Sequence, residues 1–296
     1  MGSPFSEVGS APQVSNAHLE SKGDRSVSPW GVALAKRVGS AALFLPFFVW
    51  LVEYAPAWLF LAFVVLVGAR GQWEFTRMFG RAGCEAYTWL GLGAGIAVTG
   101  SFALPGAGPL ALSLTVAACL SVSLMRARAH GMAWEPCALT LLGVCYVNWL
   151  LGYSLWLRAL PHGADWIFLL VWVTWVGESA AYFVGITLGR HKLSALVSPA
   201  KTVEGALAQF LVSAPAALAG PWWFFPECSV KDALLVGLIL GCVGQVGDLV
   251  ESFLKRSART KDTGGLIPGH GGLLDRLDSL LFNTPTLFYY ARYLAT

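Results

Sequence analysis

Uncharged, largely apolar stretches follow one another along this 296-residue chain. A helix needs about 20 mostly apolar residues to cross a bilayer, and somewhat fewer where its polar ends reach the interface. Only 12% of the residues are charged, whereas about a quarter are charged in soluble domains. The sequence therefore predicts a membrane protein. The uncharged stretches are 38–52, 54–69, 86–125, 136–157, 166–177, 205–226, 233–247 and 279–291.

Two turn signals set the number of spans. The run Leu104-Pro105-Gly106-Ala107-Gly108-Pro109 divides the stretch 86–125, because Pro and Gly are typical of turns. Glu53-Tyr54-Ala55-Pro56 divides 38–69 in the same way. We therefore expect an all-α, polytopic transmembrane helical bundle of about nine spans.

The positive charges provide an independent test of this count. Cytoplasmic loops of membrane proteins carry an excess of Lys and Arg. If the amino terminus is cytoplasmic, 17 of the 20 Lys and Arg residues fall in cytoplasmic segments, and only Arg158, Lys231 and Arg292 fall on the other side. This alternation favours nine spans, with the amino terminus inside and the carboxyl terminus outside.

The chain divides into three parts by composition. Residues 1–33 are rich in Ser, Gly and Pro, which predicts a disordered cytoplasmic tail. Residues 34–160 are expected to form amino-terminal transmembrane helices. Residues 161–296 are expected to form a catalytic transmembrane region with a cytoplasmic-side site, because ionisable groups, which are costly in lipid and mark functional sites, gather there. The net charge of +3 is spread along the chain, so nucleic-acid binding is not expected.

Asp248 lies on a helical face that is rich in glycine. The face consists of Gly237, Gly241, Gly244, Asp248, Ser252 and Lys255, which follow one another at steps of three or four residues. Closely spaced glycines in lipid mark helix packing, which predicts that Asp248 points into the protein near the cytoplasmic end. A polar cluster that only packs helices is the alternative to a functional site.

The segment after this helix mixes bases, acids and glycines. Guanidinium groups, ammonium groups and free backbone N–H groups are suited to phosphate, and carboxylates are suited to Mg²⁺. Together they predict a site for a polyphosphate and a divalent cation. A basic loop that touches anionic lipid is the alternative, but it leaves the aspartates and glycines unexplained. The bases are Lys255, Arg256, Arg259, Lys261 and Arg276, and the acids are Asp262, Asp275 and Asp278.

Two motifs stand out in the second half of the chain. The first, which we call the signature segment, is Ser252-x-Leu254-Lys255-Arg256-x4-Lys261-Asp262-x-Gly264-x2-Ile267-Pro268-x-His270-Gly271-Gly272-Leu273-x-Asp275-Arg276-Leu277-Asp278. The second is Ala181-Tyr182-Phe183-x-Gly185-x3-Gly189-Arg190-x-Lys192-Leu193-x4-Ser198-Pro199-x-Lys201-Thr202-x-Glu204-Gly205. Both resemble motifs of a known family, the phosphatidate cytidylyltransferases, also called CDP-diacylglycerol synthases. The chain departs from the family at Glu178, where an aspartate is usual, and at Ala200, where a lysine is usual.

The resemblance implies transfer of the cytidylyl group from CTP to phosphatidate, giving CDP-diacylglycerol and pyrophosphate, with Mg²⁺ as cofactor. A second, monovalent cation such as K⁺ stays open. Asp248 and Asp275 are our expected metal ligands, because one comes from the packed helix face and the other from beyond the glycines, and the resemblance implies the same pair. A ligand role for Glu178 also stays open, because it keeps the charge with a longer reach.

The remaining candidate residues are expected to contact the substrates. Ser198 and Pro199 are predicted as N-cap and first residue of a helix, with Lys201 and Thr202 in its first turn. His270 is interpreted as a hydrogen bonder that orders its loop rather than as a nucleophile, and Glu204 as either a partner of a substrate-binding group or a charge near the helix start. The expected catalytic residues are Asp248, Asp275, Lys255, Lys261 and Arg276. The expected substrate-binding residues are Ser198, Lys201, Thr202, Glu204, Arg256, Asp262, His270, Gly271, Gly272 and Asp278.

Other functions remain as alternatives at this point. They are a CTP-dependent lipid-alcohol kinase, a synthase that acts on an ether-lipid phosphate, and an ion or phosphate transporter. A transporter would place polar groups on both sides of the midplane, whereas here they gather at one end. We expect an integral protein of a bacterial inner membrane with its active site on the cytoplasmic side. Its expected partners are CTP, phosphatidate and membrane lipid, and a homodimer stays open.

Overall fold

The computed structural model describes residues 44–264 and 271–295. The predicted tail over 1–33 and the candidate His270 lie outside these residues. Residues Leu45–Thr296 form one compact unit. Within the described ranges the secondary structure is helical apart from one short hairpin.

Helices make up the first half of the described chain, and they begin and end where the turn signals predict. A short apolar helix ends at Glu53, and the next begins after Pro56. Gly106, in the left-handed region with φ of 72°, precedes another helix start. The elements are Phe44–Glu53, α2 (Ala57–Arg81), α3 (Thr88–Ser101), α4 (Ala107–His130), and α5 (Glu135–Gly143), η1 (Val144–Trp149) and α6 (Leu150–Arg158), which follow one another without a break.

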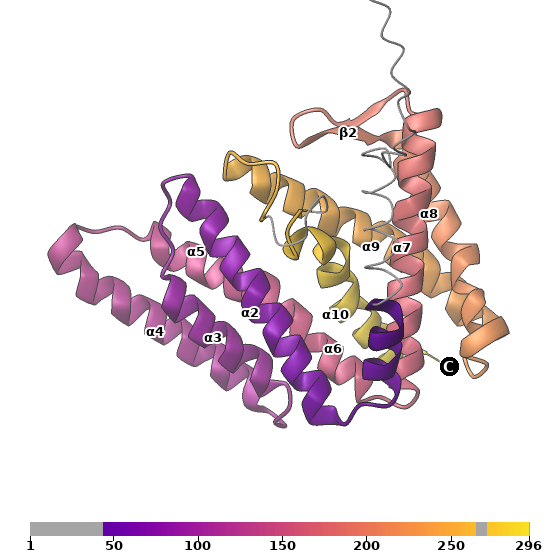
Figure 1. Cartoon of the computed structure of the whole chain (residues 1–296), viewed down its shortest axis with the longest axis horizontal. Helices are drawn as coiled ribbons and strands as arrows, with labels where there is room; N and C mark the ends of the chain where they lie inside the picture. Colours follow the sequence, from indigo (N-terminus) through magenta and orange to yellow (C-terminus); the bar gives the residue numbers. More distant parts are fainter. Residues whose placement is uncertain (1–43, 265–270, 296) are drawn as a thin grey trace, which may run out of the picture. The chain divides into compact units, whose positions relative to one another are not determined.

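Four helices, α7, α8, α9 and α10, make up most of the second half of the chain. In Figure 1, α7 and α8 run beside each other, and the small hairpin precedes α8. The elements are α7 (Gly163–Thr187), β1 (Lys192–Ser194), β2 (Ser198–Thr202), α8 (Val203–Ala217), η2 (Gly220–Phe224), α9 (Val230–Ser257), η3 (Leu274–Arg276) and α10 (Asp278–Tyr293).

Six helical segments in the described part of the chain are long and apolar enough to cross a membrane. The protein is therefore an all-α integral membrane protein. In its described part, each of the nine predicted apolar segments overlaps a helix. The count of nine spans stays a prediction, because α3, α10 and the first helix fall outside these six. The six segments are Ala57–Arg81, Ala107–Ala127, Glu135–Arg158, Gly163–Thr187, Val203–Phe224 and Val230–Ser257.

The glycine face of α9 packs against two helices, as predicted. A Cβ atom at Gly237 would lie 2.6 Å from the Cα of Ala214 on α8, and one at Gly244 would lie 2.7 Å from Nδ2 of Asn283 on α10. At Gly237 the contact is with backbone, so only glycine allows α8 to come this close, whereas at Gly244 the end of the Asn283 side chain would have to shift. The close packing fixes the direction in which the polar end of α9 points.

Buried polar contacts also join the amino-terminal helices. The Asn148 amide donates to Gln72 Oε1 at 3.1 Å, and Thr99 Oγ1 lies 3.3 Å from Asn148 Oδ1. All three side chains are fully buried. Hydrogen bonds between buried polar groups hold helices together in lipid, where packing alone provides no hydrophobic driving force.

One helix begins later than the sequence predicts. Ser198, expected as an N-cap, lies in β2 and pairs with Ser194 across the antiparallel hairpin. α8 begins at Val203, and its N-cap is Thr202, whose side chain accepts a hydrogen bond from Gly205 N–H. The prediction was wrong because Ser and Thr are both good N-caps, and the strand pairing, which is not local, decides between them.

Candidate active site

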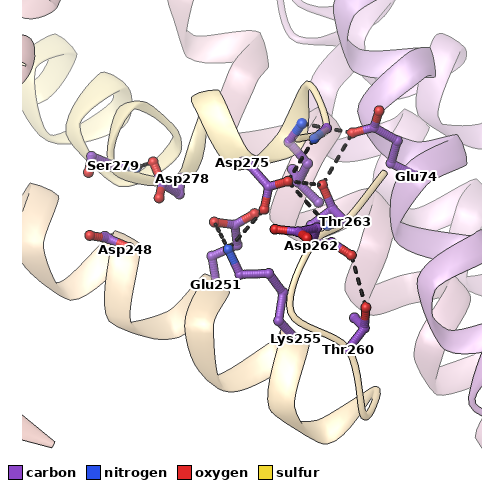
Figure 2. Close-up of polar contacts among 12 residues, drawn as sticks. Glu74, Asp248, Glu251, Lys255, Thr260, Asp262, Thr263, Asp275, Asp278 and Ser279 are labelled. Carbon is purple, nitrogen blue, oxygen red and sulfur yellow. Dashed lines mark hydrogen bonds and ion pairs between the residues drawn. The ribbon is translucent and has the colours of Figure 1, made fainter. Parts of the chain in front are cut away.

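Charged side chains from separate segments of the chain meet in one cluster. Figure 2 shows Asp248 and Glu251 from α9 facing Asp275 and Asp278, which come from η3 and the start of α10. β2 adds Lys201, whose Nζ lies 2.6 Å from Oδ2 of Asp248. The two motifs, far apart in the sequence, thus contribute to the same cluster.

Three of these carboxylates lie close enough to share a cation. Asp248, Glu251 and Asp278 each offer one oxygen atom, and these three atoms lie within 4.8 Å of one another. Opposite ligands of an octahedral Mg²⁺ are about 4.2 Å apart, because each Mg–O distance is about 2.1 Å. Glu251 is fully buried, and among the described residues no donor reaches its Oε1. The donor set therefore fits a hard divalent cation.

Lys255 connects this group to Asp275. Its Nζ lies 3.1 Å from Oε2 of Glu251 and 2.9 Å from Oδ1 of Asp275. The other oxygen of Asp275 accepts hydrogen bonds from Gly272 N–H at 2.8 Å and from the Thr263 hydroxyl at 2.9 Å. Burial alone would raise the pKa of Asp275, but the hydrogen bonds from Lys255 and Gly272 and the charge of Lys255 outweigh it and hold that pKa below its ordinary value.

The charges of the cluster do not cancel. If all groups were ionised, the two lysines would neutralise only part of the charge of the four carboxylates, and two negative charges would remain. Burial and the nearby charges of Asp248 and Glu251 raise the pKa of Asp278 well above its ordinary value, which shows how strongly this excess opposes ionisation. Glu178 on α7 also interacts with Asp248, and the positive charges of Lys201 and Arg276 offset part of its charge. One divalent cation would balance the excess, and an arriving triphosphate would otherwise be repelled.

The structure brings together only part of the predicted site. Asp248, Asp275, Asp278, Lys255 and Lys201 form the cluster, whereas the other candidates lie around it. Thr202 caps α8, and Glu204 accepts from the backbone N–H groups of Arg190 and His191, which ties the start of the hairpin to α8. Arg256 donates to the carbonyl of Val197. Lys261, Asp262 and Arg276 are exposed.

The two described glycines of the Gly-His-Gly-Gly run have backbone roles. Gly271 has a φ of 83°, which strains any other residue. A Cβ atom at Gly272 would lie 2.6 Å from Oε2 of Glu74. Neither position tolerates a side chain, for reasons that do not involve a phosphate.

Sequence reasoning missed two residues of the site. Glu251 had a local signal, because it lies one turn from Asp248 and one turn from Lys255. Glu74 on α2 belongs to the run Trp73-Glu74-Phe75-Thr76-Arg77-Met78, which also resembles the family, but that resemblance gave it no role. Its carboxylate is 2% exposed and contacts the signature segment from the other half of the chain. The cluster and the helices around it define a membrane protein with a partly buried centre of carboxylates and lysines.

Comparison with known proteins identifies the family. The family model described as the cytidylyltransferase family matches residues 35–294. The chain belongs to this family. It is 41% identical over 149 residues to Uncharacterized protein YnbB of Escherichia coli strain K12, covering 48% of this chain and 49% of that protein.

Two other relatives carry a functional name. The identity is 40% over 151 residues to the phosphatidate cytidylyltransferase of Bacillus subtilis strain 168, covering 50% of this chain and 55% of that protein. It is 38% over 150 residues to the phosphatidate cytidylyltransferase of Staphylococcus aureus strain COL, covering 51% of this chain and 57% of that protein. The matches span about half the length of these curated relatives.

Proposed function

We propose that this protein transfers the cytidylyl group of CTP to phosphatidate, giving CDP-diacylglycerol and pyrophosphate for phospholipid biosynthesis. The carboxylate and lysine cluster carries this proposal, because it combines oxygen ligands for Mg²⁺ with cations for phosphate groups. Family membership and the names of the two relatives support the same reaction. No observation favours a kinase or a transporter.

The proposed chemistry needs no strong base. A phosphate monoester has a second pKa of about 6, so phosphatidate is mostly dianionic near neutral pH. Its phosphate oxygen would attack the α-phosphorus of CTP, the bond from that phosphorus to the bridging oxygen would break, and pyrophosphate would leave. The residues of the cluster would act mainly by positioning the substrates and neutralising charge, as in other phosphoryl transfers.

We propose that Asp248, Glu251 and Asp278 hold Mg²⁺, together with Asp275. Mg²⁺ would neutralise charge on the triphosphate. Asp248 is also held by Lys201, and Asp275 by Lys255, so both lysines keep carboxylates in place and lie where phosphate oxygens would approach. A ligand role for Glu178 and the binding of K⁺ as a second cation are also proposals.

The proposed orientation places this cluster at the cytoplasmic side of a bacterial inner membrane, where CTP is available. Contacts between loops support the alternation of nine spans. Lys201 and Asp248, both predicted inside, form an ion pair. Arg158 donates to the carbonyl of Ala55, and both are predicted outside. Phosphatidate would then approach from the inner leaflet.

A labelling assay tests the reaction. Purified protein is incubated with phosphatidate and with CTP labelled on the α-phosphorus, with and without Mg²⁺. We expect Mg²⁺-dependent appearance of label in the lipid. Label that stays in the nucleotide as CDP would identify a kinase instead and refute the proposal.

The same assay tests the proposed metal ligands. Asp248→Asn and Asp275→Asn should each abolish Mg²⁺-dependent turnover while the protein stays folded in detergent. Asp275 could bind the metal or could orient Lys255. In a less damaging variant such as Asp275→Glu, the Mg²⁺ concentration that gives half the maximal rate distinguishes these two roles. A rise of at least about tenfold indicates a ligand, whereas a lower rate with unchanged Mg²⁺ dependence indicates that Asp275 serves to orient Lys255. Retained activity in both Asn variants contradicts the metal assignment.

A further inference from the structure

Glu74 is a buried carboxylate that lies far from the site in sequence and next to it in space. It belongs to α2, and its side chain is only 2% exposed. It contacts Thr263 and Leu274, which follow it by 189 and 200 positions. Burying a carboxylate is costly unless its charge is paired and its oxygens accept hydrogen bonds, so each of its contacts matters.

The two oxygens of Glu74 have different surroundings. Oε2 accepts a hydrogen bond from Leu274 N–H at 2.8 Å and lies 3.4 Å from the Thr263 hydroxyl. Oε1 forms an ion pair with Arg70 on the same helix at 2.9 Å, and no hydrogen-bond donor among the described residues reaches it. Arg70 therefore balances the charge, while the oxygen that faces the site binds the backbone beside Asp275. An apolar side chain would pack there but would leave the N–H of Leu274 unpaired.

Two glycines let the carboxylate reach the backbone of the signature segment. A Cβ atom at Gly264 would lie 2.9 Å from Oε1 of Glu74, and one at Gly272 would lie 2.6 Å from Oε2. Glu74 thus touches the chain at two places, one before and one after the residues 265–270. At the second place Glu74 also accepts the hydrogen bond from Leu274 N–H, whereas at the first place its contact is one of packing.

The groups next to Glu74 are those that hold Asp275. Oδ2 of Asp275 accepts hydrogen bonds from Thr263 N–H at 3.2 Å, from the Thr263 hydroxyl at 2.9 Å and from Gly272 N–H at 2.8 Å. The Thr263 hydroxyl has one proton, and the shorter distance assigns it to Asp275. Figure 2 shows Glu74 and Asp275 on opposite sides of Thr263. Displacing Glu74 would therefore displace the donors of Asp275.

We propose that Glu74 is a positioning residue for the site: by accepting the hydrogen bond from Leu274 N–H and packing against Gly264 and Gly272, it orients Asp275 and, through Asp275, Lys255. This inference rests on the proposed function for its kinetic test, but not for its structural test. The amino-terminal helices then complete the site, which the two motifs of the second half do not form alone.

Three variants test this role. Glu74→Ala removes both oxygens, and Glu74→Gln keeps an oxygen that can accept from Leu274 N–H but loses the charge facing Arg70. Thr99→Val is the matched control, because Thr99 is equally buried in the amino-terminal helices but its hydrogen bonds go to Asn148. Thermal midpoints in detergent identify any variant that does not fold.

The kinetic readout separates positioning from general damage. We expect Glu74→Ala to lower kcat about 10- to 100-fold, because small displacements of groups that support a metal site have effects of that size. In Glu74→Ala the KM for CTP should change less than about threefold. Glu74→Gln should recover part of the lost kcat, and Thr99→Val should keep the kcat of the unmodified protein. A kcat within about threefold of the unmodified protein in Glu74→Ala, or an equal loss in Thr99→Val, would overturn the proposal.

Hydrogen exchange tests the same contact without any substrate. We expect faster exchange of the Gly272 and Leu274 amides in Glu74→Ala than in the unmodified protein or in Thr99→Val, and partial protection in Glu74→Gln. Unchanged exchange in Glu74→Ala would overturn the proposal even if turnover fell. If the unmodified protein transfers no label to lipid, the proposed function fails, and the exchange result still decides whether Glu74 holds this backbone.

Discussion

Lys255 joins two buried carboxylates, so its removal tests whether charge organises the site. Nζ lies 3.1 Å from Glu251 and 2.9 Å from Asp275, whose side chains are 0% and 11% exposed. At an effective dielectric constant of about 20, each pair is attracted by about 5 kcal/mol. Desolvation offsets much of this attraction, and removing one partner of a buried pair costs about 3–5 kcal/mol. We expect Lys255→Met to lower the free energy of unfolding by that amount.

A second substitution isolates the electrostatic part of this loss. In the double variant Lys255→Met, Glu251→Gln, the buried carboxylate that has lost its partner is itself neutral. We expect the double variant to recover about 2 kcal/mol, which is within the range of coupling between residues in contact. Lys255→Arg is the control. Because it keeps the positive charge, its free energy of unfolding should fall less than that of Lys255→Met.

Titration with SDS in mixed micelles, followed by tryptophan fluorescence, measures these free energies. A loss of less than about 1 kcal/mol in Lys255→Met would show that the ion pairs contribute no more than exposed ones do. A double variant no more stable than Lys255→Met would show that Glu251 is not the source of the loss. Either result refutes the argument that Lys255 is needed to keep the two carboxylates together.

Two further predictions concern the glycines and the orientation. Gly271→Ala should cost about 1–2 kcal/mol of stability from its left-handed backbone and should also lower turnover, because the new Cβ atom would lie 2.8 Å from Asp275 Oδ2. Gly83→Ala is matched in φ, at 84°, with no atom within 4 Å of its Cβ position, so turnover measured in both should fall only in Gly271→Ala. Cys84 is exposed in the loop after α2, and a membrane-impermeant maleimide should label it only from the cytoplasmic side. In a variant without Cys84, Tyr54→Cys should be labelled only from the other side, and the opposite pattern would reverse the proposed orientation.

Local patterns predicted the parts of this fold that local physics determines. Proline and glycine placed the helix starts after Pro56 and Gly106, because proline fixes its own φ and glycine readily adopts the left-handed conformation. The spacing of glycines on α9 predicted a packed face that ends at Asp248, because residues three or four apart share a side of a helix. The start of α8 was mispredicted, because Ser198 and Thr202 are equivalent as caps until the hairpin forms.

Glu251 and Glu74 show why the rest of the site was not predictable. A Glu followed four residues later by a Lys is typical of an exposed helix pair, which contributes about 0.3–0.5 kcal/mol. Here the same spacing is fully buried at Glu251, because η3 and α10 place Asp275 and Asp278 over it. Glu74 has no spacing relation to Leu274 at all. The sequence therefore indicates which residue types the site contains, whereas the packing of distant helices decides which carboxylates come together and which ones contact the segments that carry the others.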